Sequence, residues 1–500
     1  MLSAIVFLPA LAAAALLAVP RQAPRGLFLW VWAGVSAADL ALVIAAWAGY
    51  HGGFAWTEDV TWIPSAGVGY HVGVDGLSLP LLALTAVLFL AVAVYSLRET
   101  RRVKSYVCLF LFLQAVSLGL FTALDLILFF VYFDLSIVGM FFIIAGWGHG
   151  PQARAAAVKF FLYTFTGSLA LLLGFIGLYL AVRPHTFDMV TLIRANPLAG
   201  RGGYGGLVLL AVAVGLAIKT PVVPFHTWLP PAHTEAPGAG SAILAGVLLK
   251  MGTYGFVRIA MPMLPGTWRR YAAAFVVVGV VSVIYGALVA LAQASFKRMI
   301  AYTSVNHMGY IILAVGAAGI LAPGAAQARS LAVTGAVTQM VSHGLLTGAL
   351  FLLSGVLYDR GGTYDMAAYS GLAGPAPAFA GVTAVAAFGS LGLPGLSGFI
   401  AEFQIFTGSL ATAAVATAIA VTGILITAAL FLRALQRIFT GPLRVPGGPG
   451  TPAALRDLTP AETAGIVPLL VLAVIIGILP RFLLDLIEPA ARTLTHLVAR

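Results

Sequence analysis

Long apolar runs are the feature that most constrains the fold of this chain. A helix needs about 20 apolar residues to cross a bilayer, and counting such runs indicates about fourteen spans. They are expected at residues 2–20, 27–48, 76–97, 104–122, 124–146, 154–182, 204–230, 239–261, 271–294, 298–320, 329–358, 378–410, 413–438 and 463–488. Only 9% of the 500 residues are charged, against roughly 25% in a soluble domain. The sequence therefore predicts an all-α integral membrane protein.

Two of these expected spans are interrupted. In the seventh, Lys219 is followed at once by Pro221 and Pro224, and proline ends a helix because it lacks the backbone N–H. In the twelfth, the glycine-rich stretch GSLGLPGLSGF precedes Glu402. Corresponding interruptions in two halves of a membrane protein indicate inverted repeats with ion sites at the breaks. We therefore expect two inverted five-helix repeats, each containing a broken helix.

This pattern divides the chain into four parts. Residues 1–103 hold the first three spans, residues 104–261 the first repeat, residues 271–438 the second repeat, and residues 439–500 a loop and the last span. An even number of spans places both termini on one side. With the termini outside, the inner loops carry fifteen lysines and arginines against nine on the outer side. Because such residues concentrate in cytoplasmic loops, we expect both termini on the outer, periplasmic or extracellular, side.

Three ionisable residues of the first half lie at depths where a charge is costly. Asp134 is about ten residues from either end of its span, and Lys250 is about 16 Å into its own. Lys219 ends the run before the first break and is the natural partner of Asp134. Charged residues inside a membrane mark ion pathways by default. The alternatives are a structural acid satisfied by its neighbours and a lysine whose head reaches the interface.

Three residues of the second half would continue such a pathway. His307 and His343 lie in spans ten and eleven, and histidine titrates near neutral pH, as a proton relay requires. Glu402 follows the second break and would face whatever cavity that break lines. Each has a structural alternative, because lone histidines are often satisfied core residues and Glu402 could reach solvent at the end of its span.

Several function classes are excluded by the sequence. Cys108 is the only cysteine, so the chain has no internal disulfide and no cysteine-ligated metal or iron–sulfur site. No glycine-rich phosphate loop follows a predicted strand, and we expect neither nucleotide nor flavin binding. The net charge of +11 is scattered between apolar runs, where orientation in the membrane explains it better than nucleic-acid binding.

Three segments carry a resemblance to a known family. They are IKTPVVPFHTWLPPAHTEAPGAGSAILAGVLLKMGTYGFVRI, KRMIAYTSVNHMGY and GAVTQMVSHGLLTGALFLLSGVLYDR. They resemble the antiporter-like membrane subunits of respiratory complex I, the proton-translocating NADH:quinone oxidoreductase. The resemblance covers most of the chain and is weaker in the first 100 residues and after Arg444.

The resemblance implies roles for individual residues. Lys219 would pair with the fifth-span acid, which is usually glutamate and here is Asp134, one methylene shorter. A shorter acid favours a bridging water over direct contact. Lys250 would be the central lysine, with His307 and His343 matching family histidines. Glu402 would be the terminal group toward the outside, where the cation antiporter subunits of the Mrp type usually carry lysine.

The sequence thus predicts a proton-translocating subunit of a bacterial NADH:quinone oxidoreductase in the plasma membrane. It would hold no cofactor itself, and NADH, flavin, iron–sulfur clusters and quinone would belong to partner subunits. Its partners would be the lipid bilayer and the other membrane subunits, especially neighbouring antiporter-like ones. Three alternatives stay open: an Mrp-type cation/proton antiporter subunit, a subunit of a related hydrogenase or formate-linked complex, and a membrane anchor without a transport role.

Overall fold

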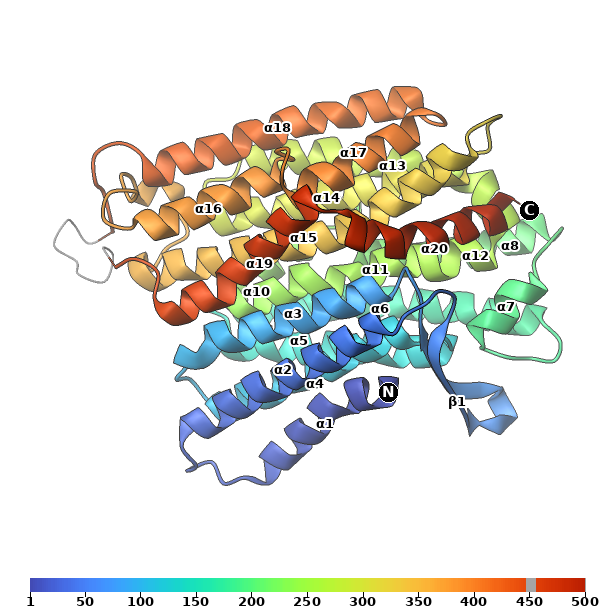
Figure 1. Ribbon diagram of the computed structural model, residues 1–500, viewed down its shortest axis with the longest axis horizontal. Helices are drawn as coiled ribbons and strands as arrows, with labels where there is room; N and C mark the ends of the chain where they lie inside the picture. The colour runs from blue at the N-terminus through green and yellow to red at the C-terminus, as the bar shows by residue number, and fades with distance from the viewer. Residues whose placement is uncertain (447–455, 500) are drawn as a thin grey trace.

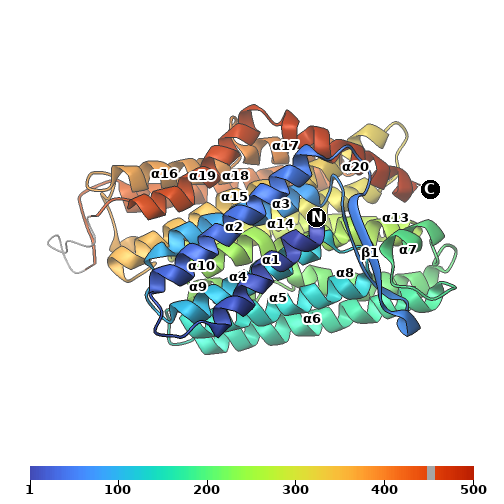
Figure 2. The same ribbon diagram turned by 60° about the horizontal axis from the view of Figure 1, so that its bottom comes forward.

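The computed structural model describes residues 1–446 and 456–499. The fold is almost entirely helical, and Figures 1 and 2 show the long helices lying side by side along the longest axis. The α-helices are α1 (Leu2–Ala18), α2 (Arg25–Ala48), α3 (Leu79–Tyr95), α4 (Val103–Thr122), α5 (Leu126–Trp147), α6 (Ala153–Ala181), α7 (Met189–Ala195), α8 (Gly202–Lys219), α9 (Leu229–Glu235), α10 (Gly238–Ile243), α11 (Leu249–Gly255), α12 (Met261–Met263), α13 (Pro265–Leu291), α14 (Phe296–Gly319), α15 (Ala326–Gly361), α16 (Pro377–Ser390), α17 (Ser397–Leu410), α18 (Ala414–Phe439), α19 (Pro460–Ile478) and α20 (Arg481–Ala499).

The predicted membrane class agrees with these elements. Among the described residues, eleven helices are long and apolar enough to cross a membrane, and α1 and α16 are shorter apolar helices. In two of the eleven, the segment Gly238–Met263 and α15, the most apolar 18-residue stretch is completely buried by the helices around it. The centre of the bundle is therefore made from these two segments, which carry Lys250 and His343.

Both predicted breaks are present. The first separates α8 from α9 with a turn that begins at Thr220, directly before Pro221. The second separates α16 from α17, and its turn places Gly392 and Gly395 at positive φ values of 80° and 92°. Glycine is required there because a Cβ atom disfavours that backbone region. The first break thus arises because proline lacks a backbone N–H group, and the second arises because glycine can adopt positive φ angles.

The buried segment around Lys250 is not a uniform α-helix. Two π-helical turns, η3 (Leu244–Leu248) and η4 (Phe256–Ala260), flank α11 on either side. Single π turns inside α-helices occur frequently at functional sites. The first of them contains Ala245, whose carbonyl accepts a hydrogen bond from Lys250.

The region after α2, which lies between two of the expected spans, forms a β-hairpin. Strand β1 (Ala55–Ile63) pairs antiparallel with β2 (Val68–Val74). The hairpin is fastened to α7 through His71, whose Nδ1 donates to Asp188 Oδ2 at 2.6 Å. At the end of β2, Asp75 receives a hydrogen bond from the buried guanidinium of Arg258. These two contacts fix the hairpin at one end of the bundle.

The last expected span, residues 463–488, is shorter than predicted. Helix α19 ends at Ile478 and a separate helix, α20, begins at Arg481, because Pro480 interrupts the ladder of backbone hydrogen bonds. Helix α20 buries Leu483, Ile487 and Leu494 and exposes Arg481 and Arg492. It is an amphipathic helix packed on the bundle, and α15 is among the helices that it contacts.

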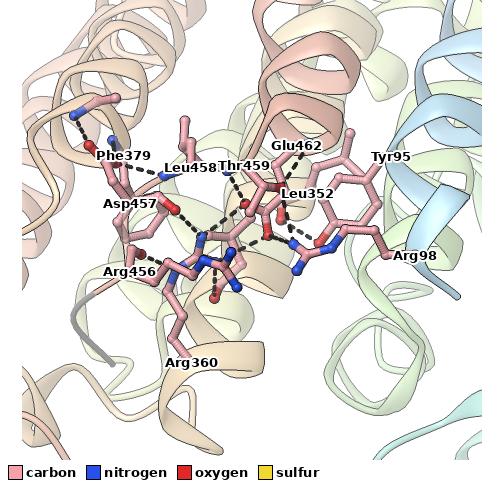
Figure 3. A network of polar contacts seen from close by, with 12 residues as sticks. Tyr95, Arg98, Leu352, Arg360, Phe379, Arg456, Asp457, Leu458, Thr459 and Glu462 are labelled. Carbon is pink, nitrogen blue, oxygen red and sulfur yellow. Dashed lines mark hydrogen bonds and ion pairs between the residues drawn. The ribbon is translucent and has the colours of Figure 1, made fainter. Parts of the chain in front are cut away.

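A polar network fastens the opposite end of the bundle (Figure 3). Glu462, in the first turn of α19, accepts from Arg98 after α3 and from Arg360 in the last turn of α15, at 3.3 and 2.9 Å. Arg360 also donates to the carbonyl of Asp457, whose carboxylate accepts from the backbone of Phe379 in α16. The network joins α3, α15, α16 and α19.

Asp39, for which the sequence suggests no partner, is held inside the bundle. Its Oδ2 accepts from Gln114 Nε2 at 2.7 Å, and Gln114 Oε1 accepts from Ser36 Oγ at 2.8 Å. All three side chains are fully buried. The chain of hydrogen bonds connects α2 with α4 and explains Asp39 as a helix-packing residue.

Candidate functional site

Lys219 lies at the first break with its side chain turned toward α5. The residue is 1% exposed, and its Nζ donates to Ser136 Oγ at 2.9 Å. The same Nζ lies 4.8 Å from the centre of the Phe133 ring, close enough for a cation–π contact. The lysine is therefore stabilised by a hydroxyl and a ring face on the helix that carries the predicted acid.

Asp134 stands next to these residues on α5 but does not contact Lys219 directly. Among the described residues no ion pair within 4.0 Å joins the two, although each lies in the electrostatic field of the other. Asp134 Oδ1 is buried without a hydrogen-bond partner. A buried carboxylate oxygen needs such a partner, and a bridging water would supply it.

Lys250 lies at the centre of the bundle, fully buried. Its Nζ donates to the carbonyl of Ala245 at 2.5 Å, one π turn earlier in its own segment. It also lies 2.6 Å from His343 Nδ1 on α15, which accepts from the ammonium. With Nδ1 accepting, the ring proton is on Nε2, and Nε2 donates to Ser304 Oγ at 3.2 Å.

His307 continues this line toward the second break. Its ring centre lies 5.3 Å from that of His343, and its Nε2 donates to the carbonyl of Ser390 at 3.1 Å. The same Nε2 is 4.0 Å from Glu402 Oε1. Ser390 is the last residue of α16, so the carbonyl released by the break is the one that holds the histidine.

Glu402 is 4% exposed and faces the glycine turn between α16 and α17. A Cβ atom on Gly392 would collide with the Glu402 carboxylate, so the turn needs glycine for space as well as for its φ angle. A small pocket is lined by Glu402, His307, His343 and hydroxyl or amide side chains, including Ser342 and Gln339. The carboxylate is therefore buried in a polar pocket.

The structure brings four of the six predicted residues into one line, in the order Lys250, His343, His307 and Glu402. Each can hold a proton. Lys250 Nζ lies 2.6 Å from His343 Nδ1, the ring centres of His343 and His307 are 5.3 Å apart, and His307 Nε2 lies 4.0 Å from Glu402 Oε1. Proton transfer needs groups within hydrogen-bond reach or separated by one water. Lys219 and Asp134 form a separate group at the first break.

One residue of the first group was missed from the sequence. Ser136 is the hydrogen-bond partner of Lys219, but a serine in an apolar run usually bonds to its own helix, and Ser136 Oγ also donates to the carbonyl of Phe133. His233, in α9, stacks on Phe351 with 4.3 Å between ring centres and lies outside the line.

Among the described residues, no three or more histidine, cysteine, aspartate or glutamate side chains are grouped to hold a metal ion. The site consists of buried titratable groups inside a bundle of apolar helices with two broken elements. That combination defines a class of membrane subunit that carries ions or protons through its interior.

Comparison with known sequences identifies the family. The sequence model described as NADH:quinone oxidoreductase/Mrp antiporter, transmembrane, matches residues 123–427. The chain belongs to this family. It is 37% identical to the NADH-quinone oxidoreductase subunit M of Rhodobacter capsulatus, covering 100% of this chain and 96% of that protein. It is 39% identical to an NAD(P)H-quinone oxidoreductase chain 4 of Picosynechococcus, covering 81% of this chain and 74% of that one.

Solved structures agree with this assignment. A chain of respiratory complex I from Thermus thermophilus superimposes with a TM-score of 0.89 at 29% identity, with 100% of both chains covered. A chain of the Mrp complex from Dietzia superimposes with a TM-score of 0.85 at 24% identity, covering 99% of this chain and 98% of that one. The second likeness shows a common fold.

Proposed function

We propose that this chain is the M-type, proton-translocating membrane subunit of a NADH:quinone oxidoreductase. The observation that carries the proposal is the line from Lys250 through His343 and His307 to Glu402. Family membership and the relatives named subunit M support it. NADH, flavin, iron–sulfur clusters and quinone would be held by partner subunits, among them neighbouring antiporter-like chains.

The route begins at the first break and ends at the second. Protons enter from the cytoplasm near Lys219, reach Lys250, pass the two histidines and leave past Glu402. The protonation states of Lys219 and Asp134 are coupled, because moving the carboxylate away changes the free-energy cost of a positive charge on the lysine. About fourteen spans, two inverted repeats at residues 104–261 and 271–438, and termini outside a bacterial plasma membrane complete the proposal.

The test is proton pumping by inverted membrane vesicles supplied with NADH. Lys250→Ala and Glu402→Gln each lose most pumping per assembled complex, because one removes the central proton-holding group and the other the terminal one. Lys159→Ala is the matched control, because this lysine lies on the exposed face of α6. Normal pumping in both site variants would contradict the route and favour the anchor alternative.

The chief rival is a cation/proton antiporter subunit of the Mrp type. The common fold supports it, whereas Glu402 opposes it, because the resemblance implies lysine at that position in the antiporters. The discriminating measurement is transport in vesicles with and without sodium. Pumping that needs NADH and is independent of sodium supports the oxidoreductase. Sodium-dependent proton movement without NADH would support the antiporter.

A further inference from the structure

An apolar groove lies between α8 and α13, beside the exposed side chains of Leu207 and Leu210. The cavity measures about 440 Å³ and is bounded at its inner end by Val222 and Phe225 of the first break. Helix α8 packs mainly against α6, and α13 mainly against α14, so the two helices touch each other only sparsely. The groove is the space between these two sparsely packed helices.

Small residues of α8 line part of the groove, together with leucines of the same helix. Gly203, Gly206, Ala213 and Ala217 line one wall, and the bulky Phe275 of α13 stands in the other. From Gly203 to Ala217 helix α8 rises about 21 Å. Half of the hydrocarbon core of a bilayer measures about 15 Å. The groove is thus long enough for one acyl chain that starts at the headgroup level.

Two arginines stand at the mouth of the groove. Arg201 precedes α8 directly, and Arg270 lies in the second turn of α13, with its guanidinium against Gly202. Both side chains are exposed, and among the described residues neither has an acidic partner within 4.0 Å. Neither α8 nor α13 has a side-chain cap at its N-terminus, so unpaired N–H groups and the positive end of each helix dipole meet at this mouth.

We propose that this groove is a binding site for an anionic phospholipid. One acyl chain lies against Gly206, Ala213 and Phe275, and the phosphate is held by Arg201 and Arg270. Charge complementarity selects this ligand, because a lipid chain alone needs no arginine and arginine pairs with phosphate through two parallel hydrogen bonds. This site is separate from the proton route and does not depend on the function proposed for the chain.

The experiment uses the assembled complex in its native membrane. A photoreactive phenylalanine derivative replaces Leu210, a lining residue whose side chain is 60% exposed, the membrane is illuminated, and the adduct is identified by mass spectrometry. We expect a phospholipid adduct with an anionic headgroup. An adduct to a protein segment would show that a partner helix occupies the groove and would overturn the proposal, as would an adduct to zwitterionic lipid in proportion to its abundance.

Charge variants test the headgroup contact. Arg201→Gln and Arg270→Gln each lower the yield of anionic-lipid adduct about fivefold, which corresponds to about 1 kcal/mol per arginine near an anionic phosphate. Arg183→Gln is the matched control, because Arg183 is exposed beyond the end of α6 and does not line the groove, and its loss leaves the yield unchanged. Equal yields in all three variants would contradict the assignment of the headgroup to this mouth.

A bulk variant tests the acyl position without changing charge. Ala213→Phe fills the groove and lowers the amount of anionic phospholipid that co-purifies with the complex. Ala155→Phe makes the same change of side chain at an exposed residue of α6 and leaves the co-purified lipid unchanged. Unchanged lipid in the Ala213→Phe complex would refute the acyl position.

Discussion

At the scale of single residues, His343 is the side chain on which the proposed route depends most directly. It is in contact with Lys250 on one side and faces His307 on the other. Its neutral form accepts from the lysine and donates to Ser304, so it can take a proton at one nitrogen while the other is already occupied. A non-titrating side chain at this position would divide the line into two parts.

His343→Ala should therefore reduce NADH-driven pumping by about a hundredfold or more, the usual contribution of a positioned acid–base group. His185→Ala is the control, because the His185 side chain hydrogen-bonds to the carbonyl of Tyr179 and stacks on its ring, outside the line. Pumping and quinone reduction are measured in vesicles and normalised to assembled complex. Retained pumping in His343→Ala would show that protons pass Lys250 by another path.

Asp134 tests the group at the first break. Asp134→Glu should keep activity because it restores the acid usual in the family and extends the carboxylate toward Lys219. Asp134→Asn should remove most quinone-coupled pumping by leaving the lysine without a counter-charge. The measurement is the pumping rate of assembled complexes. Full pumping in the asparagine variant would refute a coupled pair.

The residues of the site could be proposed from the sequence, but their contacts could not. A lysine or carboxylate inside an apolar run is visible without a structure, because its cost at that depth is known. That Lys250 meets His343 depends on how two buried segments 93 residues apart pack together. Ser136 was missed because nothing in the sequence distinguishes a serine that serves a lysine from one that bonds only to its own helix.

At the scale of elements, the second break depends on close approach of backbone atoms. A Cβ atom on Gly398 would collide with the carbonyl of Gly389 across the turn, whereas Gly381 of α16 has open space around it. Gly398→Ala should therefore lower stability by about 1–3 kcal/mol, and Gly381→Ala should leave it nearly unchanged. Thermal inactivation of the purified complex measures both. Equal behaviour of the two variants would contradict the packing at the break.

The buried contact between α2 and α4 supplies a second element-scale prediction. Asp39→Leu leaves the Gln114 amide without its acceptor inside the bundle, which should cost about 1–3 kcal/mol. Asp39→Asn retains an acceptor oxygen of the same size and should cost much less. The comparison is made by thermal stability of the purified complex, with pumping measured in parallel. Loss of pumping in a stable Asp39→Asn complex would assign Asp39 to transport.

Some of the elements could be predicted from the sequence better than others. Apolar runs gave the long helices, and the breaks followed from Pro221 and from the glycines before Glu402. The hairpin was missed, although the segment GYHVGV alternates in the manner of a strand. The end of α19 was placed too late because the apolar residues after Pro480 read as a continuation of the span, whereas they form the buried face of α20.

At the scale of the whole molecule, the pair His71 and Asp188 fastens the hairpin to the bundle. Hydrogen bonding to Asp188 raises the pKa of His71 above its usual 6.5, although burial opposes the shift. Burial would raise the pKa of Asp188, but hydrogen bonds from His71 and Thr191 outweigh it, and the pKa lies below 3.8. The protonated histidine stabilises the fold fully below about pH 6.5, and this stabilisation is lost as the pH rises through its raised pKa. The aspartate stabilises it above 3.8 and loses this effect as pH falls through its lowered pKa.

The hairpin should therefore be held most firmly between about pH 4 and 6.5 and should loosen in alkali. Hydrogen exchange of peptides from residues 55–74, corrected for intrinsic rates, should be faster at about pH 9 than at about pH 6. His71→Gln should exchange fast at both values. A wild-type hairpin with the same corrected rate at both would contradict the role of this pair.

The two π turns around Lys250 have a consequence for the length of the chain. Each contains one residue more than an α-helical turn would, so deleting a single residue within Leu244–Leu248 returns that stretch to ordinary α-helical hydrogen bonding. A deletion inside a buried helix normally displaces everything beyond it. Here the surplus residue absorbs the deletion, so the residues on either side keep their faces and Lys250 still points toward His343. The shortened chain should therefore still assemble, with Lys250 in place.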